Sequence, residues 1–203
     1  MSDYRITSNS NRILPGDMDG ELHRLPWRLT GMALIGLSVI GWLSLLTWSI
    51  GDPSFNRATN GLARNLLGTT GASLADMLLQ LFGLVSIALF LPLAIWGHLM
   101  SRGDVITNTR HRLIMWALSM FLLSSTLAMF SKPDTWFLEH GLGGVVGDIG
   151  QNIFMHIGGF MEPTFAKIIG GLISGFFGVW TLTRASALTY TDIKLLWHIP
   201  ERK

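Results

Sequence analysis

Residues 52–83, DPSFNRATNGLARNLLGTTGASLADMLLQLFG, join two long apolar runs and so decide how this chain is organised. The first half is polar and rich in turn-forming residues, among them Pro53 and the pair Asn60 and Gly61, which end the first apolar run. The second half becomes a helical pattern, and Thr69 or Thr70 is the expected N-cap of that helix.

Composition predicts an integral membrane protein. Of the 203 residues, 49% are hydrophobic and only 14% are charged, whereas soluble domains carry about 25% charged residues. The formal net charge of +2 is too small to argue for nucleic-acid binding. The sequence contains no cysteine, which excludes disulfides and thiolate metal sites but does not decide the compartment.

Four segments are expected to cross the membrane as helices, which makes the predicted fold class an all-α integral membrane protein. The first contains 23 uncharged residues, or about 35 Å of helix, enough for a hydrocarbon core of about 30 Å. A cleaved signal peptide is the less favoured alternative, because its apolar region is only about 7–15 residues long. Pro92 is expected to bend the second span. The four spans are predicted at about 29–51, 71–101, 113–131 and 164–184.

An additional amphipathic helix is expected at about 145–160, on the periplasmic side. Its apolar residues recur at helical spacing, while its glycines and Asp148 make it a poor spanning segment. We therefore expect it to lie on the interface or dip partly into it, and whether it inserts stays open. The apolar positions are Val146, Ile149, Ile153, Ile157 and Phe160.

The distribution of basic residues predicts that both termini are cytoplasmic. Eleven of the 15 Lys and Arg residues fall in the two terminal segments and the 101–112 loop, which four spans place on one side. The expected organisation is a mobile cytoplasmic tail over 1–25, a four-helix transmembrane domain over 26–190, and the start of a cytoplasmic linker over 191–203.

The sequence shows no constellation that supports catalysis, cofactor binding or metal binding. It contains neither the P-loop pattern that cradles phosphates nor an HExxH or GxSxG motif. Gln80 and His98 lie near opposite ends of the second span, so they are expected to be wetted or helix-bridging polar groups rather than a transport site.

The clearest functional pattern in the sequence indicates close helix packing in the fourth span. Small residues recur every fourth position in the fourth span, a spacing that lets two transmembrane backbones approach closely. The pattern fits contact with another helix of the same chain and contact with a helix of a second subunit equally well. In either case Gly175→Leu is expected to disrupt the helix association. The packing residues are Gly170, Ser174 and Gly178, with Gly171 and Gly175 beside them, and Ser124 and Ala128 form a weaker seam on the third span.

The residues around the first polar segment, taken in order ahead of a membrane span, carry a family resemblance. They are Asp52, Pro53, Ser54, Asn60, Gly68, Gly71, Ala72, Ala75, Asp76, Phe82 and Gly83. This set resembles the first periplasmic segment in the N-terminal four-transmembrane domain of FtsK/SpoIIIE-type bacterial DNA translocases.

The resemblance implies a membrane-anchoring and oligomerisation module of a hexameric translocase at the division septum of the inner membrane. It implies contacts with membrane proteins of the division machinery, and a motor elsewhere in the parent protein that uses ATP and magnesium to move DNA. Asp52 and Asp76 are expected to cap or charge helix N-termini, with a periplasmic partner contact as the alternative. A small four-helix transporter or channel subunit is the main alternative function, and a membrane enzyme is a third.

Overall fold

The computed structural model describes residues 16–55, 61–136 and 138–187, with the backbone alone over 16–23, and every regular element in these ranges is helical. The all-α fold class is therefore confirmed. The elements are α1 (Gly16–Leu46), α2 (Gly68–Phe82), the 3-10 turn η1 (Gly83–Val85), α3 (Ser86–Leu89), α4 (Leu91–Ser101), α5 (Thr109–Ala128), α6 (Gly144–Ile157) and α7 (Pro163–Ala185).

Four of these helical stretches are long and apolar enough to cross a membrane, as predicted. Large apolar side chains such as Leu37 and Ile40 on α1, and Leu172 and Phe176 on α7, are exposed on their outer faces. In a bilayer such faces contact lipid, so this exposure fits the membrane fold. The stretches are Arg24–Leu46, Gly68–Ser101, Thr109–Ala128 and Pro163–Ala185.

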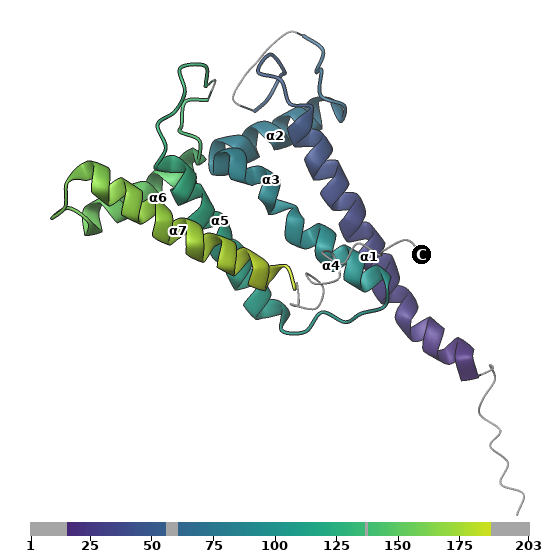
Figure 1. The fold of residues 1–203 in the computed structure, drawn as a ribbon. Helices are drawn as coiled ribbons and strands as arrows, with labels where there is room; N and C mark the ends of the chain where they lie inside the picture. Colours follow the sequence, from purple (N-terminus) through teal and green to yellow (C-terminus); the bar gives the residue numbers. More distant parts are fainter. Residues whose placement is uncertain (1–15, 56–60, 137, 188–203) are drawn as a thin grey trace, which may run out of the picture.

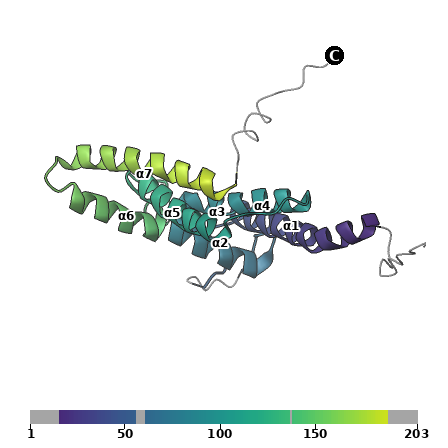
Figure 2. The ribbon, with the colours of Figure 1, turned by 90° about the horizontal axis from the view of Figure 1, so that it is seen from below.

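The spans form two antiparallel pairs, α1 with α4 and α5 with α7 (Figures 1 and 2). Glycines allow the first pair to approach closely, because a Cβ on Gly97 would lie 2.7 Å from the carbonyl oxygen of Gly31. We call the end where α1 and α5 terminate and α7 begins the loop end. At the opposite, terminal end, α1 and α5 begin while α4 and α7 finish (Figure 1).

The two pairs are joined mainly at the loop end, through α2, η1 and α6. The hydrophobic core lies there, where side chains of α1, α2 and the segment before α6 meet; its buried members are Leu45, Ala75, Leu78, Leu79, Phe90 and Leu138. At the terminal end the pairs meet again, where Trp96 Nε1 donates to the Ala185 carbonyl over 2.8 Å. The Trp96 ring also lies edge-on to Trp116.

The first span has different bounds from those expected. α1 begins at Gly16 rather than at residue 29, so the tail predicted over 1–25 is helical from residue 16 onward. It ends at Leu46 rather than at 51, because the backbone then changes from i→i−4 bonds to turns with i→i−3 bonds. The N–H of Trp48 donates to the Leu45 carbonyl, and the N–H of Asp52 donates to the Ser49 carbonyl.

The bend in the second span lies at Gly83, not at Pro92 as expected. Gly83 has a φ of +59°, a left-handed conformation that interrupts the helix between α2 and α3. Pro92 instead stands in the first turn of α4, where its missing N–H costs no helical hydrogen bond. The N–H of Ala94 still donates to the Phe90 carbonyl over 3.0 Å, so the chain continues smoothly there.

The helix predicted at 145–160 is α6, which spans Gly144–Ile157. Its glycine face is buried, with Gly147 and Gly150 packed against α5, while Ile149, Ile153 and Ile157 are exposed. The apolar stripe thus points away from the protein. This orientation suits contact with the apolar part of a membrane.

Candidate functional site

The residues of the sequence motif gather at the loop end, around a buried carboxylate. Asp52 is 3% exposed, and its two oxygens accept the backbone N–H groups of Arg64 at 2.8 Å and Asn65 at 3.1 Å. A charged acceptor makes these bonds stronger than neutral ones. Asp52 therefore fixes the segment before α2 against the end of α1.

Asn65 is the second member of this cluster and is 4% exposed. Its Nδ2 donates to the Ser44 carbonyl over 2.8 Å, and its Oδ1 accepts the N–H of Leu67 over 3.0 Å. The Ser44 hydroxyl donates onward to the Gly71 carbonyl. This chain of bonds ties α1 to the first turn of α2, and we call Asp52, Asn65, Ser44 and Gly71 the clasp.

Gly71 is required in the clasp for steric reasons. A Cβ at this position would collide with the Asn65 side chain and with Leu67. The neighbouring motif residues Ala72 and Ala75 are fully buried on the same face of α2. Small residues at these positions let α2 lie directly on α1, which explains the small-residue character of the motif.

The expected capping roles are wrong in detail. The N-cap position of α2 is Leu67, and no side chain caps it, so neither Thr69 nor Thr70 is the cap. Asp52 binds the backbone of the preceding segment rather than the start of the helix. Asp76 lies inside α2, where its Oδ2 accepts from Gln80 Nε2 over 2.9 Å, one turn further on.

Gly83 forms a second assembly at the loop end. A Cβ there would collide with the Leu142 carbonyl, and the N–H of Leu84 donates to that same carbonyl over 3.0 Å. Gly144, also left-handed with a φ of +65°, lies against the Gln80 and Leu81 carbonyls. We call this contact between η1 and the start of α6 the glycine joint.

The weaker seam predicted on the third span is occupied by α6. The Ser124 carbonyl and Ala128 face Gly143 and Gly147, and no Cβ would fit between them. The Ser124 hydroxyl also reaches the Phe82 carbonyl at 3.4 Å. The seam therefore connects the two helix pairs within this chain.

The main small-residue face of α7 packs against α5. Ser174 is fully buried, and its hydroxyl lies 2.9 Å from Thr126 Oγ1, while Gly178 lies against Leu123. Gly170, at the same register, contacts Met129 and Phe154. Gly170, Ser174 and Gly178 therefore make helix contacts within this chain.

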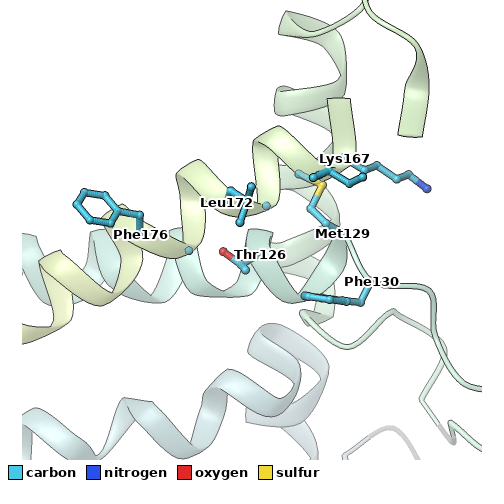
Figure 3. A pocket seen from close by; sticks show the side chains of 9 residues that line it. Thr126, Met129, Phe130, Lys167, Leu172 and Phe176 are labelled. Carbon is cyan, nitrogen blue, oxygen red and sulfur yellow. The ribbon is translucent and has the colours of Figure 1, made fainter. Parts of the chain in front are cut away.

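Gly171 and Gly175 are not part of that buried face. They are half-buried and line a groove of about 640 Å³ between α5 and α7 (Figure 3). The other lining residues are Thr126, Met129, Phe130, Lys167, Ile168, Leu172 and Phe176.

Among the described residues, no group of three or more His, Cys, Asp or Glu side chains could hold a metal ion. The buried hydroxyls of the spans donate to backbone carbonyls: Ser38 to Leu34, Ser125 to Phe121 and Thr181 to Phe177. His98 is exposed near the end of α4. These hydroxyls supply hydrogen bonds that stabilise the helices. A histidine–carboxylate pair lies outside the spans, where His140 Nδ1 and Asp148 Oδ2 are 3.0 Å apart.

The motif residue Asn60 lies outside the described residues. Several residues that build the clasp, the glycine joint and the close approach of α1 to α4 were not singled out in the sequence. Asn65 lies between motif positions, and Gly31, Gly97 and Gly143 look like ordinary glycines of a membrane protein. A spacing of small residues between different spans could have indicated Gly31 and Gly97, but a single sequence gives no pairing of spans.

Comparison with known proteins gives one family. The family model described as "4TM region of DNA translocase FtsK/SpoIIIE" matches residues 24–191. The DNA translocase FtsK of Rhizobium meliloti (strain 1021) is 34% identical over 188 residues, which cover 90% of this chain and 20% of that protein. The DNA translocase FtsK of Brucella melitensis biotype 1 is 32% identical over 189 residues, 93% of this chain and 22% of that protein.

The similarity extends to other bacteria: the DNA translocase FtsK of Caulobacter vibrioides is 30% identical over 173 residues, which cover 82% of this chain and 21% of that protein. The chain thus spans about a fifth of the length of these relatives. No solved structure matches it.

Proposed function

Because this chain belongs to the family of the 4TM region of DNA translocase FtsK/SpoIIIE, we propose that it is the membrane-anchoring and oligomerisation module of a septum-located DNA translocase. In this role it acts in cell division and chromosome segregation and performs no catalysis itself. The observation that carries the proposal is the family match over residues 24–191, together with four helices that can span a membrane.

The proposal assigns each ligand to its own part of the full-length protein. ATP, magnesium and DNA belong to a motor region outside these residues, since the sequence here has no Walker motif. The partners of this region are the lipid bilayer, further copies of the chain, six by family resemblance, and membrane proteins of the division machinery. The clasp and the glycine joint support a rigid loop end on which such partners could dock.

Both termini are proposed to be cytoplasmic. The terminal end of the bundle carries Arg102, Arg110, Arg112 and Arg184, whereas Arg64, Lys132 and Lys167 are at the loop end. Basic residues favour the cytoplasmic side of a membrane. In the inner membrane, the clasp and the glycine joint would then face the periplasm.

Cysteine labelling tests this orientation without background, because the chain has no cysteine. Thr107→Cys and Asp134→Cys both replace exposed residues, near the terminal end and the loop end respectively. In spheroplasts, a membrane-impermeant maleimide should label Asp134→Cys at once and Thr107→Cys only after permeabilisation. The reverse pattern would show that the termini are periplasmic.

A fluorescent fusion of residues 1–203 tests the anchoring role in cells that retain their native translocase. We expect a band at the division site, and no band for a fusion to an unrelated four-span membrane protein of similar length. Uniform fluorescence along the membrane for both fusions would show that this region does not direct septal placement.

The alternative of a transporter or channel subunit finds no specific support among the described residues. The hydroxyls of the spans are used in helix backbone contacts, and the buried carboxylate of Asp76 in the second span accepts a hydrogen bond from Gln80 one turn further on. A channel would need polar groups that converge within the membrane. Proton flux into liposomes that contain the purified chain would reveal such an activity.

A further inference from the structure

The groove between α5 and α7 lies where two glycines of α7 leave room beside α5. A Cβ on Gly175 would lie 3.3 Å from the Thr126 side chain, and one on Gly171 would lie 3.6 Å from the Met129 side chain. Because the two glycines carry no side chain, the floor of the groove is helix backbone. The result is an elongated apolar groove on the outside of a membrane-spanning pair (Figure 3).

The groove offers no free polar group in its interior. Its one hydroxyl, on Thr126, already donates to the Leu122 carbonyl over 2.9 Å and lies 2.9 Å from the Ser174 hydroxyl. The remaining walls come from side chains such as Met129, Leu172 and Phe176. An occupant of the groove should therefore be apolar and should not require hydrogen bonds there.

The length of the groove matches one leaflet of a bilayer. Lys167 and Phe176 mark its two ends and are nine residues apart on α7, which corresponds to about 13.5 Å along the helix. Half of a hydrocarbon core of about 30 Å is about 15 Å. A single acyl chain that starts at the interface would thus run the length of the groove.

Lys167 places one positive charge at the mouth of this groove. Its side chain extends away from the helix pair, with the ammonium group at the far end (Figure 3). No acidic side chain among the described residues pairs with it. Since Lys167 stands in the second turn of α7, its ammonium lies at the level of lipid headgroups.

From these observations we propose that the α5–α7 groove binds one acyl chain of an anionic phospholipid, whose phosphate pairs with Lys167. The proposal rests on the membrane fold and not on the oligomerisation role. A transmembrane helix of a second copy is the competing occupant, because Gly171 and Gly175 would allow close approach. The apolar groove of one-leaflet length, with a free cation at its mouth, favours the lipid.

Spin-labelled phospholipids provide the test in vesicles that contain the purified full chain. The motionally restricted fraction is measured for phosphatidylglycerol and for phosphatidylcholine with the same labelled acyl chain. We expect a preference for phosphatidylglycerol that falls about fivefold in Lys167→Gln, the factor expected for one lysine near an anionic surface. Lys132→Gln is the matched control, because Lys132 already donates to the Glu139 carbonyl and does not line the groove.

Gly175→Leu fills the groove and tests the acyl-chain site itself. We expect it to lower the restricted fraction for both lipids, while Val179→Leu, on an exposed part of α7 outside the groove, leaves the fraction unchanged. If Lys167→Gln keeps the full preference for phosphatidylglycerol, the proposal is wrong. It is also wrong if Gly175→Leu abolishes crosslinking between copies while the restricted lipid stays the same, because the groove then holds a protein helix.

Discussion

Asp52 shows what a single buried charge does in this protein. Its carboxylate holds two backbone N–H groups of a segment that has no regular structure of its own. Asp52→Asn replaces one acceptor oxygen with an NH2 group that faces a donor, so one N–H is left unpaired. We expect the free energy of unfolding to fall by about 2 kcal/mol, measured in detergent micelles by the intrinsic tryptophan fluorescence.

Asp134→Asn is the matched control for Asp52→Asn, because Asp134 is exposed near the same end of the bundle. It should leave the unfolding transition unchanged. Equal transitions for both variants would mean that the clasp does not stabilise the fold.

Glu162 makes the start of α7 sensitive to pH. A hydrogen bond from the Thr164 hydroxyl, with further bonds from the N–H groups of Thr164 and Phe165, lowers the pKa of the Glu162 carboxyl below its usual value. The cap is therefore fully present above the ordinary glutamate pKa of about 4.3. Its contribution is lost as the pH falls through the lower pKa of the folded state.

We expect the hydrogen-exchange protection factor of the Phe165 amide to decrease as the pH is lowered from about 5 into this acidic range. In Glu162→Gln the side chain stays neutral, so the protection factor should not depend on pH. A parallel pH dependence in both proteins would assign the effect to another group.

At the residue scale, the sequence could indicate which positions matter but not what they contact. The resemblance to the family marked Asp52 and Gly71, because they stand in its ordered set of small and acidic residues ahead of a span. It did not indicate Asn65, whose partners Ser44 and Gly71 become neighbours only after α1 and α2 pack. Thr69 and Thr70 look like caps, but α2 begins at Gly68, so both stand inside its first turn, and the Thr70 hydroxyl donates to the Leu67 carbonyl.

The glycine joint determines how α2 connects to the rest of the second span. Gly83→Ala puts a side chain into a left-handed conformation and against the Leu142 carbonyl. Both effects are unfavourable, and together we expect a loss of about 3 kcal/mol in the free energy of unfolding. Urea or thermal unfolding in mild detergent measures it.

Gly36→Ala gives the same chemical change where the structure tolerates it. Gly36 lies within α1, and a Cβ there meets nothing within 4 Å. Alanine favours a helix over glycine by about 1 kcal/mol, so this variant should be at least as stable as the parent. A similar loss in both variants would argue that added bulk, not the joint, is responsible.

At the element scale, apolar length identified the spans because crossing a membrane demands it. The bend was assigned to Pro92 since proline disfavours a helix interior, yet Pro92 occupies a first turn that tolerates it. Gly83 bends the chain because the Leu142 carbonyl and Gly144 pack against it. These groups lie about 60 residues away (142 − 83 = 59), so local patterns do not reveal them.

Trp96 links the two helix pairs at the terminal end of the whole molecule. Its indole N–H donates to the Ala185 carbonyl, the last residue of α7. Trp96→Phe removes this bond, and we expect a loss of about 1 kcal/mol and a looser arrangement of the pairs. Spin labels at Met32→Cys on α1 and Val179→Cys on α7, both exposed positions, should give a broader distance distribution.

Trp42→Phe is the control for this experiment. The indole N–H of Trp42 donates to the Ile87 carbonyl over the same 2.8 Å, but this bond connects α1 to α3 within the first half of the molecule. The distance distribution between the same two labels should stay as narrow as in the parent. Broadening in Trp42→Phe alone would contradict the role given to Trp96.

For the whole molecule, the number of spans and the family followed from the sequence, whereas the pairing of spans did not. From the sequence, the small-residue face of α7 could pack against a helix of the same chain or of a second subunit. The structure places Ser174 and Gly178 against α5 of the same chain. In the spans, exposed apolar residues are the rule, so hydrophobicity does not distinguish lipid-facing from protein-facing sides.

The pairing of neighbouring spans has a consequence for how the protein is made. The first pair, α1 with α4, is complete once Ser101 has been synthesised, but the Leu142 carbonyl follows 41 residues later (142 − 101 = 41). At about 5–20 residues per second, the ribosome needs about 2–8 s for this stretch. We therefore expect the nascent chain to insert as two successive hairpins, with the contact at Gly83 that unites them forming only after the second hairpin has begun to emerge.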